Sequence, residues 1–200
     1  NKTGQSPRRK LNVLVRGGSQ GAAQINAMVL AAIQSFAQQG KGAPAIVGRW
    51  TVQCGEKNLP GVREKLQGIA GAKGAAKIEL LGYHPRIADF YASADLIIAR
   101  AGAGVLAEAL AFGLPMILVP YPFAADNHQL ANAEYLETEG VAACIRTRGT
   151  EPQELIEILG RWHADGELES RALRSAELAM PDAAQTIADH LEALSGSSES

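Results

Sequence analysis

One stretch, residues 96–120, constrains the fold more strongly than any other part of the sequence. It opens with a short apolar run that is β-branched in its middle, as expected of a strand buried on both faces of a sheet. The small residues Ala101-Gly-Ala-Gly104 follow, then an apolar helix, then the break Gly113-Leu-Pro115, and then a second apolar run from Met116. The pattern predicts a strand, a tight turn, a helix and a further strand.

The small residues leave the start of this helix almost without side-chain bulk. A helix N-terminus carries unpaired N–H groups and the positive end of the helix dipole, and both favour a phosphate. Glu108 follows Gly104 by about one helical turn and stands among apolar residues. Its carboxylate cannot favour the phosphate, but it can accept hydrogen bonds from a neighbouring sugar diol, and an unpaired buried carboxylate would be costly. We therefore interpret the stretch as a nucleotide-sugar or dinucleotide site; the alternative is that the small residues only permit close packing of helix on sheet.

The rest of the sequence repeats this unit. Strands are expected at residues 11–15, 45–54, 77–81, 96–99, 116–119 and 141–145. Helices are expected between them at residues 22–39, 62–71, 86–94 and 128–139, and two or three more should follow, with breaks near residues 165–166 and 181–182. This alternation predicts an α/β fold, a Rossmann-like parallel sheet of about six strands with helices on both faces and C-terminal helices appended. Residues 11–194 would form that domain, after a linker or arm at residues 1–10 and before a disordered Ser-rich tail at residues 195–200.

Charge and composition narrow the class of function. A formal net charge of -2 gives no general attraction to nucleic acid or to an anionic membrane. No apolar run reaches the roughly 18 residues of a spanning helix, and the polar, basic start lacks the apolar core of a signal peptide. A chain that begins with Asn1 is expected to be a fragment or one domain of a longer protein. The sequence thus favours a small-molecule site.

Cysteine and histidine spacing argues against a metal site. Cys54 and Cys144 are far apart, and we expect a buried pair of thiols in a reducing compartment rather than a disulfide. The four histidines are scattered, and no Asp-x-Asp pair is present to hold a divalent metal on a diphosphate. A departing diphosphate would therefore depend on protein dipoles.

Three other turns follow predicted strands and should meet residues 101–104 at one edge of the sheet. The first, residues 17–22, is glycine-rich but departs from the dinucleotide fingerprint, and Glu56 comes too late to be the acidic residue that a dehydrogenase needs. The second, residues 82–85, carries Tyr83, which is either a core aromatic or the edge of a base pocket. The third, residues 120–127, leads into Asp126-Asn-His-Gln129, where helix capping explains the first two residues but not the last two.

These residues together resemble a known family. Gly-Gly-Ser-Gln-Gly-Ala, Arg-Ala-Gly-Ala-Gly with Glu108, Gly-Leu-Pro, and Asn-His-Gln with Asn132-Ala133 are similar to the C-terminal half of the MurG family, which are peptidoglycan N-acetylglucosaminyltransferases. The resemblance covers residues 11–194. It implies one half of a GT-B fold that binds the donor UDP-N-acetylglucosamine, with no cofactor and no metal, in an inverting transfer to lipid I that forms lipid II.

The resemblance also implies what the chain would lack. The catalytic base, the lipid I surface and the membrane contact would belong to an N-terminal domain, so this chain alone is expected to be inactive. The whole enzyme would act in cell wall biogenesis, cell shape and cell division, in the cytoplasm at the inner face of the bacterial plasma membrane. Two alternatives stay open: a non-catalytic nucleotide-sugar-binding subunit that needs a separate acceptor-domain chain, and a UDP-sugar epimerase of the same fold.

Residue roles carry over from the resemblance by position. The implied contacts are Gly18, Ser19 and Gln20 with the diphosphate; Tyr83 and the His84 backbone with uracil; Ala103, Gly104 and Val105 with the phosphates; Glu108 with the ribose; and His128 and Gln129 with the sugar hydroxyls. Two residues depart from the family pattern. Val105 stands where the family commonly has Thr, which removes a hydroxyl donor, and Arg16 replaces a residue that is usually small or apolar.

Overall fold

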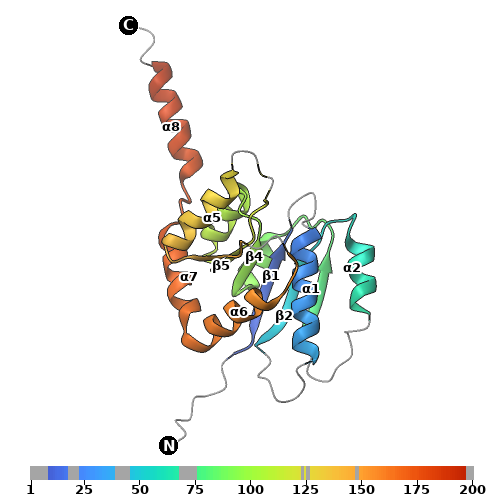
Figure 1. The fold of residues 1–200 in the computed structure, drawn as a ribbon. Coiled ribbons are helices and arrows are strands. Elements are labelled where there is room, and N and C mark those ends of the chain that lie inside the picture. Colours follow the sequence, from blue (N-terminus) through green and yellow to red (C-terminus); the bar gives the residue numbers. More distant parts are fainter. Residues whose placement is uncertain are drawn as a thin grey trace, which may run out of the picture.

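The computed structural model describes residues 9–17, 23–38, 46–67, 76–122, 124, 127–146 and 149–196 of the chain (Figure 1). The strands are β1 (Leu11–Arg16), β2 (Val47–Gln53), β3 (Lys77–Leu81), β4 (Leu96–Ala99), β5 (Met116–Leu118) and β6 (Ala142–Cys144). The helices are α1 (Ala23–Gln38), α2 (Leu59–Leu66), α3 (Ala88–Ser93), α4 (Ala103–Ala111), α5 (His128–Thr138), α6 (Gln153–Asp165), α7 (Glu167–Glu177) and α8 (Ala183–Gly196).

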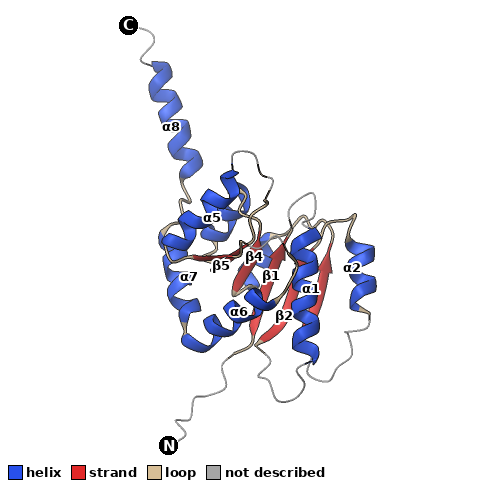
Figure 2. Ribbon diagram, viewed as in Figure 1, coloured by secondary structure: helices blue, strands red, loops and turns tan. Residues whose placement is uncertain are grey.

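All six strands are parallel and form one sheet in the order β3-β2-β1-β4-β5-β6 (Figure 2). The predicted Rossmann-like sheet with helices on both faces is therefore confirmed. The strand order runs outward from β1 in one direction and from β4 in the other. In such sheets the crevice for ligands opens between these two central strands, at their carboxyl ends.

Several predicted bounds need correction by one to three residues, among them the start of α3, which is Ala88 rather than residue 86. Helix α2 begins at Leu59, three residues before the predicted start, because Pro60 occupies its first turn, where a fixed φ and a missing N–H fit the helix. Helix α8 extends to Gly196, two residues into the predicted tail, while residues 197–200 lie outside the described part. The breaks at Gly113, Gly140 and Gly166 fall where expected, each with a positive φ that glycine adopts without strain.

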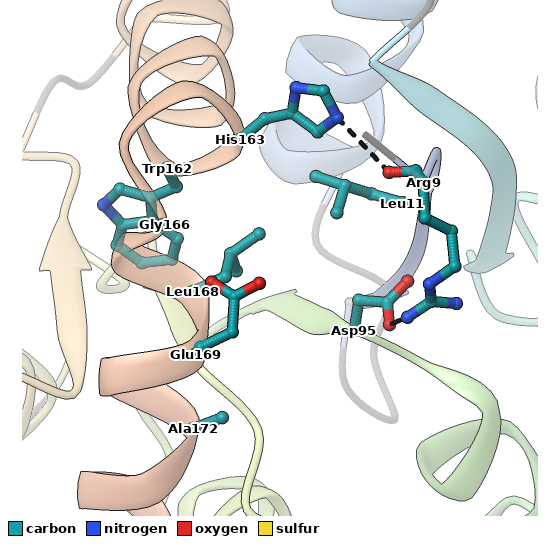
Figure 3. Close-up of a pocket in the computed structure, with 9 residues that line it drawn as sticks. All are labelled: Arg9, Leu11, Asp95, Trp162, His163, Gly166, Leu168, Glu169 and Ala172. Atoms are coloured by element: carbon teal, nitrogen blue, oxygen red, sulfur yellow. Dashed lines mark hydrogen bonds and ion pairs between the residues drawn. The ribbon is translucent and has the colours of Figure 1, made fainter. Parts of the chain in front are cut away.

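The amino ends of the strands lie at the edge of the sheet opposite to the ligand crevice. A pocket of about 390 Å³ lies there, next to the corner between α6 and α7 (Figure 3). Two of its charged groups, Arg9 and Asp95, are paired within the fold. Arg9 pairs with Asp95, and the second carboxylate oxygen of Asp95 accepts a hydrogen bond from the Asn12 N–H at 2.7 Å. A ring nitrogen of His163 lies 3.3 Å from the main-chain oxygen of Arg9. These contacts connect the start of β1 to the residue before β4 and to α6.

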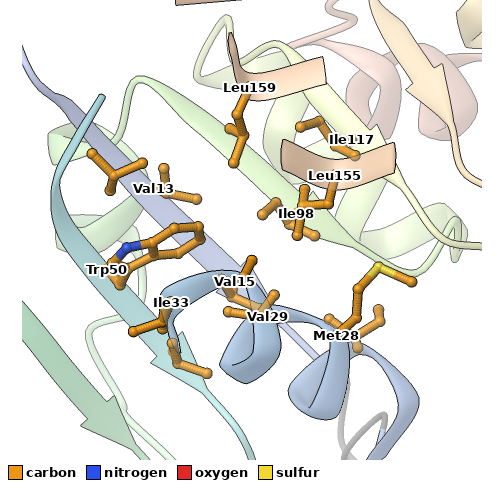
Figure 4. Close-up of a cluster of buried hydrophobic side chains, with 14 of the residues drawn as sticks. Val13, Val15, Met28, Val29, Ile33, Trp50, Ile98, Ile117, Leu155 and Leu159 are labelled. Atoms are coloured by element: carbon orange, nitrogen blue, oxygen red, sulfur yellow. The ribbon is translucent and has the colours of Figure 1, made fainter. Parts of the chain in front are cut away.

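One face of the sheet packs against α1, α2 and α6, and Figure 1 shows α1 and α6 in front of the strands. Side chains alternate along each strand, so Val13 and Val15 of β1 face this layer while Leu14 faces the other. Figure 4 shows Trp50 of β2 among the aliphatic side chains of α1, and Ile117 beside Leu155 and Leu159 of α6. Burial of this continuous apolar layer supplies the main driving force for folding.

The other face packs against α3, α4 and α5. Its buried side chains include Leu14, Ile97, Met116 and Leu118 from the strands, and Tyr91, Leu106 and Leu136 from the three helices. Strand β4 is buried on both faces, as its apolar run predicts. Packing in this layer places α3 and α4 over the carboxyl ends of β1 and β4.

Two further expectations concern the cysteines and the membrane. Cys54 and Cys144 are free and buried, as expected, and burial raises the pKa of both thiols, that of Cys144 to about 11. Within the described ranges, no helix has both the length and the apolar character needed to cross a bilayer.

Helix α8 projects from the rest of the structure, and its residues 183–192 are exposed.

Candidate functional site

The loops at the carboxyl edge of the sheet are tied together by Arg100, the residue after β4. Its guanidinium donates to the main-chain oxygens of Val119 at 2.8 Å and Pro120 at 2.9 Å, and to the side-chain oxygen of Gln24 at 3.1 Å. The Gln24 amide in turn donates to the Gly149 oxygen at 2.9 Å. Burial lowers the pKa of Arg100, and these oxygens replace its lost hydration. The segments after β4 and β5 therefore meet, as the strand-end argument predicts, and the start of α1 and the segment after β6 join them.

Helix α4 begins without a side-chain cap. Its N-cap residue, Gly102, is extended, and no side chain in the described part of the chain caps the first N–H groups. The first turn contains no acidic residue, and Ala103 and Gly104 are exposed. The main-chain donors of residues 103–105 are therefore open to a ligand, with the positive end of the helix dipole behind them.

A contact from α5 holds this turn in place. The Asn132 side chain donates to the main-chain oxygen of Ala101 at 3.0 Å. Val105 is half-buried and packs against the apolar layer below α4, so its position favours an apolar side chain. The sequence motif contained Asn132, but its role as a tether was not anticipated.

Glu108 lies at the rim of this site rather than buried among apolar residues, which corrects the sequence argument. Its side chain is 48% exposed. One carboxylate oxygen, Oε2, pairs with the Arg16 guanidinium and accepts a hydrogen bond from the Tyr91 hydroxyl at 2.7 Å. The same Arg16 donates to the Tyr91 hydroxyl at 2.8 Å and to the Gln53 side chain at 2.9 Å. The carboxylate therefore has protein partners that sequence reasoning missed.

Tyr91 is the buried member of this cluster. Its ring stacks on Phe112 with centroids 5.3 Å apart, and only the hydroxyl reaches the edge of the site. Burial and the hydrogen bond to Glu108 raise the pKa of Tyr91 well above its usual range. The hydroxyl consequently stays protonated and acts as a donor to the carboxylate.

The turn after β3 places Tyr83 in solvent, so it is not a core aromatic. Its side chain is 75% exposed, and its N–H donates to Glu56 Oε1 at 2.7 Å. A Cβ on Gly82 would lie 2.2 Å from that oxygen, so a larger residue here would have to move the Glu56 carboxylate away from the Tyr83 N–H. The His84 ring packs edge-on against Phe90 with centroids 4.9 Å apart, which leaves the His84 backbone as its candidate contact. This turn shares the carboxyl edge with Glu108 but lies two strands from β1.

Helix α5 presents His128 and Gln129 at the same edge. The Gln129 side-chain oxygen accepts a hydrogen bond from the Tyr121 N–H at 3.0 Å, which orients the amide. Asn127 precedes the helix with a left-handed φ of 53° and makes no side-chain cap, so the capping role expected of it is wrong. Asp126 and the diphosphate candidates Gly18, Ser19 and Gln20 lie outside the described residues.

No group of three or more His, Cys, Asp or Glu in the described part of the chain could hold a metal ion. The edge offers main-chain N–H groups at α4, the half-exposed carboxylate of Glu108, and amide and imidazole side chains on α5.

Comparison with known proteins identifies the family. Residues 12–187 match the glycosyltransferase family 28 C-terminal domain. The chain belongs to this family. It is 36% identical over 188 residues to the UDP-N-acetylglucosamine--N-acetylmuramyl-(pentapeptide) pyrophosphoryl-undecaprenol N-acetylglucosamine transferase of Leptospira interrogans, and the match covers 94% of this chain and 49% of that protein. The protein of the same name from Paraburkholderia xenovorans is also 36% identical, with 94% and 48% covered.

A comparison with solved structures agrees with this assignment. The crystal structure of Acinetobacter baumannii MurG superposes with a TM-score of 0.76 at 28% identity, over 92% of this chain and 50% of that one. The expected resemblance to the C-terminal half of MurG and to half of a GT-B fold is thus confirmed. This chain spans about half the length of these relatives.

Proposed function

We propose that this chain binds UDP-N-acetylglucosamine as the donor half of an inverting glycosyltransferase that converts lipid I to lipid II in peptidoglycan synthesis. One observation carries the proposal: α4 combines an uncapped N-terminus with Glu108 about one turn later, at the crevice between the two central strands. A nucleoside diphosphate has matching chemistry, an anion next to a pentose diol. The names of the relatives support UDP-N-acetylglucosamine as the donor and the lipid-linked muramyl pentapeptide as the acceptor.

The diphosphate would lie against the start of α4. The N–H groups of Ala103, Gly104 and Val105 would donate to its oxygens, where the helix dipole also favours negative charge. The glycine-rich turn with Gly18, Ser19 and Gln20 would add donors from the end of β1. Val105 supplies its N–H but no hydroxyl.

The nucleoside would extend from the phosphates toward α3 and β3. Glu108 would accept hydrogen bonds from the ribose hydroxyls through its exposed carboxylate. The Tyr83 ring and the His84 backbone would frame uracil, since the turn that carries them lies at the same edge of the sheet.

The N-acetylglucosamine would point toward α5. We assign its hydroxyls to His128 and Gln129, with Gln129 already oriented by the Tyr121 N–H. Asn132 contributes indirectly, because it ties α5 to the turn before α4.

In the reaction, the acceptor hydroxyl attacks the anomeric carbon and UDP leaves with inversion. Preorganised N–H groups stabilise the charge that develops on the departing diphosphate. The base that takes the acceptor proton would come from an N-terminal domain, in the same chain or in a partner. That domain would also contact lipid I and the inner face of the bacterial plasma membrane.

Calorimetric titration tests the donor role. The chain should bind UDP-N-acetylglucosamine and UDP more tightly than NAD, and should discriminate against UDP-glucose. Glu108→Ala should weaken UDP binding about 10- to 100-fold, as expected for hydrogen bonds to a charged acceptor, whereas Glu157→Ala on the exposed side of α6 should not. Absence of UDP binding, or tighter binding of NAD, would refute the proposal.

A further inference from the structure

We infer that Arg16 and Tyr91 are positioning residues that hold the Glu108 carboxylate by one oxygen and leave the other for the pentose, and so set a preference for ribose over deoxyribose nucleotides. The inference deepens the proposed function and rests on it. It concerns Arg16, a residue for which the resemblance implies no role.

The first step is the geometry at Glu108. Both protein donors, the Arg16 guanidinium and the Tyr91 hydroxyl, reach the same oxygen, Oε2. Oε1 has no hydrogen-bond partner among the described residues, and the side chain is half exposed. The carboxylate is therefore anchored on the protein side and open on the solvent side, where a hydroxyl donor can approach.

The second step is the rigidity of the two donors. The Arg16 side chain is 15% exposed, and its Nε is held by Gln53 at 2.9 Å. The Tyr91 ring is buried and stacked on Phe112. Both donors are thus fixed before any ligand binds, and a preorganised acceptor loses less conformational freedom on binding than a free glutamate would.

The third step explains why Arg16 reaches this place. Alternate residues of a strand share a face, so Arg16 lies on the same side of the sheet as Leu14, under α3 and α4. It is also the last residue of β1, which puts its guanidinium at the carboxyl edge. A small or apolar residue here would leave the Tyr91 hydroxyl as the one described donor to Glu108.

If Arg16 instead blocked the site, the effect of its removal would be the reverse. If the ion pair blocked the site, the ribose would have to displace Arg16, and removal of the guanidinium would tighten UDP binding. The free Oε1 argues for positioning, because a diol can bond there without breaking either contact at Oε2.

The experiment compares UDP with 2′-deoxy-UDP by calorimetry in the unmutated chain, Tyr91→Phe and Arg16→Val. The unmutated chain should prefer UDP, and each substitution should reduce that preference roughly 3- to 10-fold, the range expected for one hydrogen bond. Tyr91→Phe keeps the stacked ring and removes only the hydroxyl, so it decides the question even where Arg16→Val does not fold. Tyr135→Phe, on an exposed ring of α5, and Arg9→Met, at the opposite edge, are the matched controls and should leave the preference unchanged.

The outcomes separate the two proposals. UDP binding with a ribose preference that survives both substitutions overturns the positioning role and leaves the donor site intact. Tighter UDP binding by Arg16→Val identifies a block and also overturns it. Failure of the unmutated chain to bind UDP overturns the proposed function, and the inference with it.

Discussion

Replacement of Arg100 should show how much the convergence of loops depends on one side chain. Arg100→Met keeps the aliphatic length but removes the guanidinium, and with it the hydrogen bonds to Val119, Pro120 and Gln24. Hydrogen bonds from a charged donor are worth more than neutral ones, but the three are not additive, so the expected loss is about 2–4 kcal/mol of unfolding free energy. For a chain of this size that corresponds to a fall in Tm of roughly 5–15 °C.

Thermal and urea unfolding, followed by circular dichroism, measure this change. Arg161→Met is the matched control, because Arg161 is half exposed and its one ion pair within the described ranges is a 3.7 Å contact with Glu167. That control should change stability by less than about 0.5 kcal/mol. Arg100→Lys should recover little, because an ammonium cannot reproduce the planar fork. A loss for Arg100→Met no larger than that for Arg161→Met would refute the view that this guanidinium holds the edge together.

Three further predictions concern single contacts. Ser175→Ala removes a buried hydroxyl that donates to a main-chain oxygen at 3.0 Å, and should cost about 1–2 kcal/mol in urea unfolding; a change below about 0.5 kcal/mol would contradict this. Gly82→Ala should displace the Glu56 carboxylate from the Tyr83 N–H and cost about 0.5–1 kcal/mol, since that hydrogen bond is exposed. A double variant with Glu56→Ala should show that the two losses are not additive. Burial raises the pKa of Glu137, but hydrogen bonds from Arg146 and a main-chain N–H outweigh burial, so the net pKa is lowered. The contribution of the Glu137 carboxylate to folding stability should therefore be present above its pKa in the unfolded chain. It should disappear as the pH falls through its pKa in the folded chain. Glu137→Gln should reduce the loss of stability over that pH range in an acid-unfolding experiment. An unchanged dependence of stability on pH would show that the Glu137 carboxylate does not contribute in this way.

The sheet could be predicted because its signal is local. Each strand is a short apolar run between turn residues, and β3 and β4 have the predicted bounds. The start of α2 was missed because apolar spacing pointed to Val62, whereas Pro60 stabilises the first turn from outside that pattern. Boundaries fail where a terminal residue acts through backbone geometry rather than through burial.

The environment of Glu108 was not predictable from its neighbours in sequence. The helix around it reads as apolar, which suggested burial, yet the side chain lies at the rim and its partners are 17 and 92 residues away. One signal was available in the sequence. Arg16 is two residues from Leu14 in the same strand, so both side chains lie on the same face of the sheet. An arginine on a face otherwise lined by apolar side chains needs an anionic partner for its guanidinium. Strand parity therefore points to a specific contact. The same reasoning explains why a carboxylate can sit close to a proposed diphosphate: the Arg16 charge offsets that of Glu108, so the carboxylate can bind a hydroxyl without repelling the phosphates beside it.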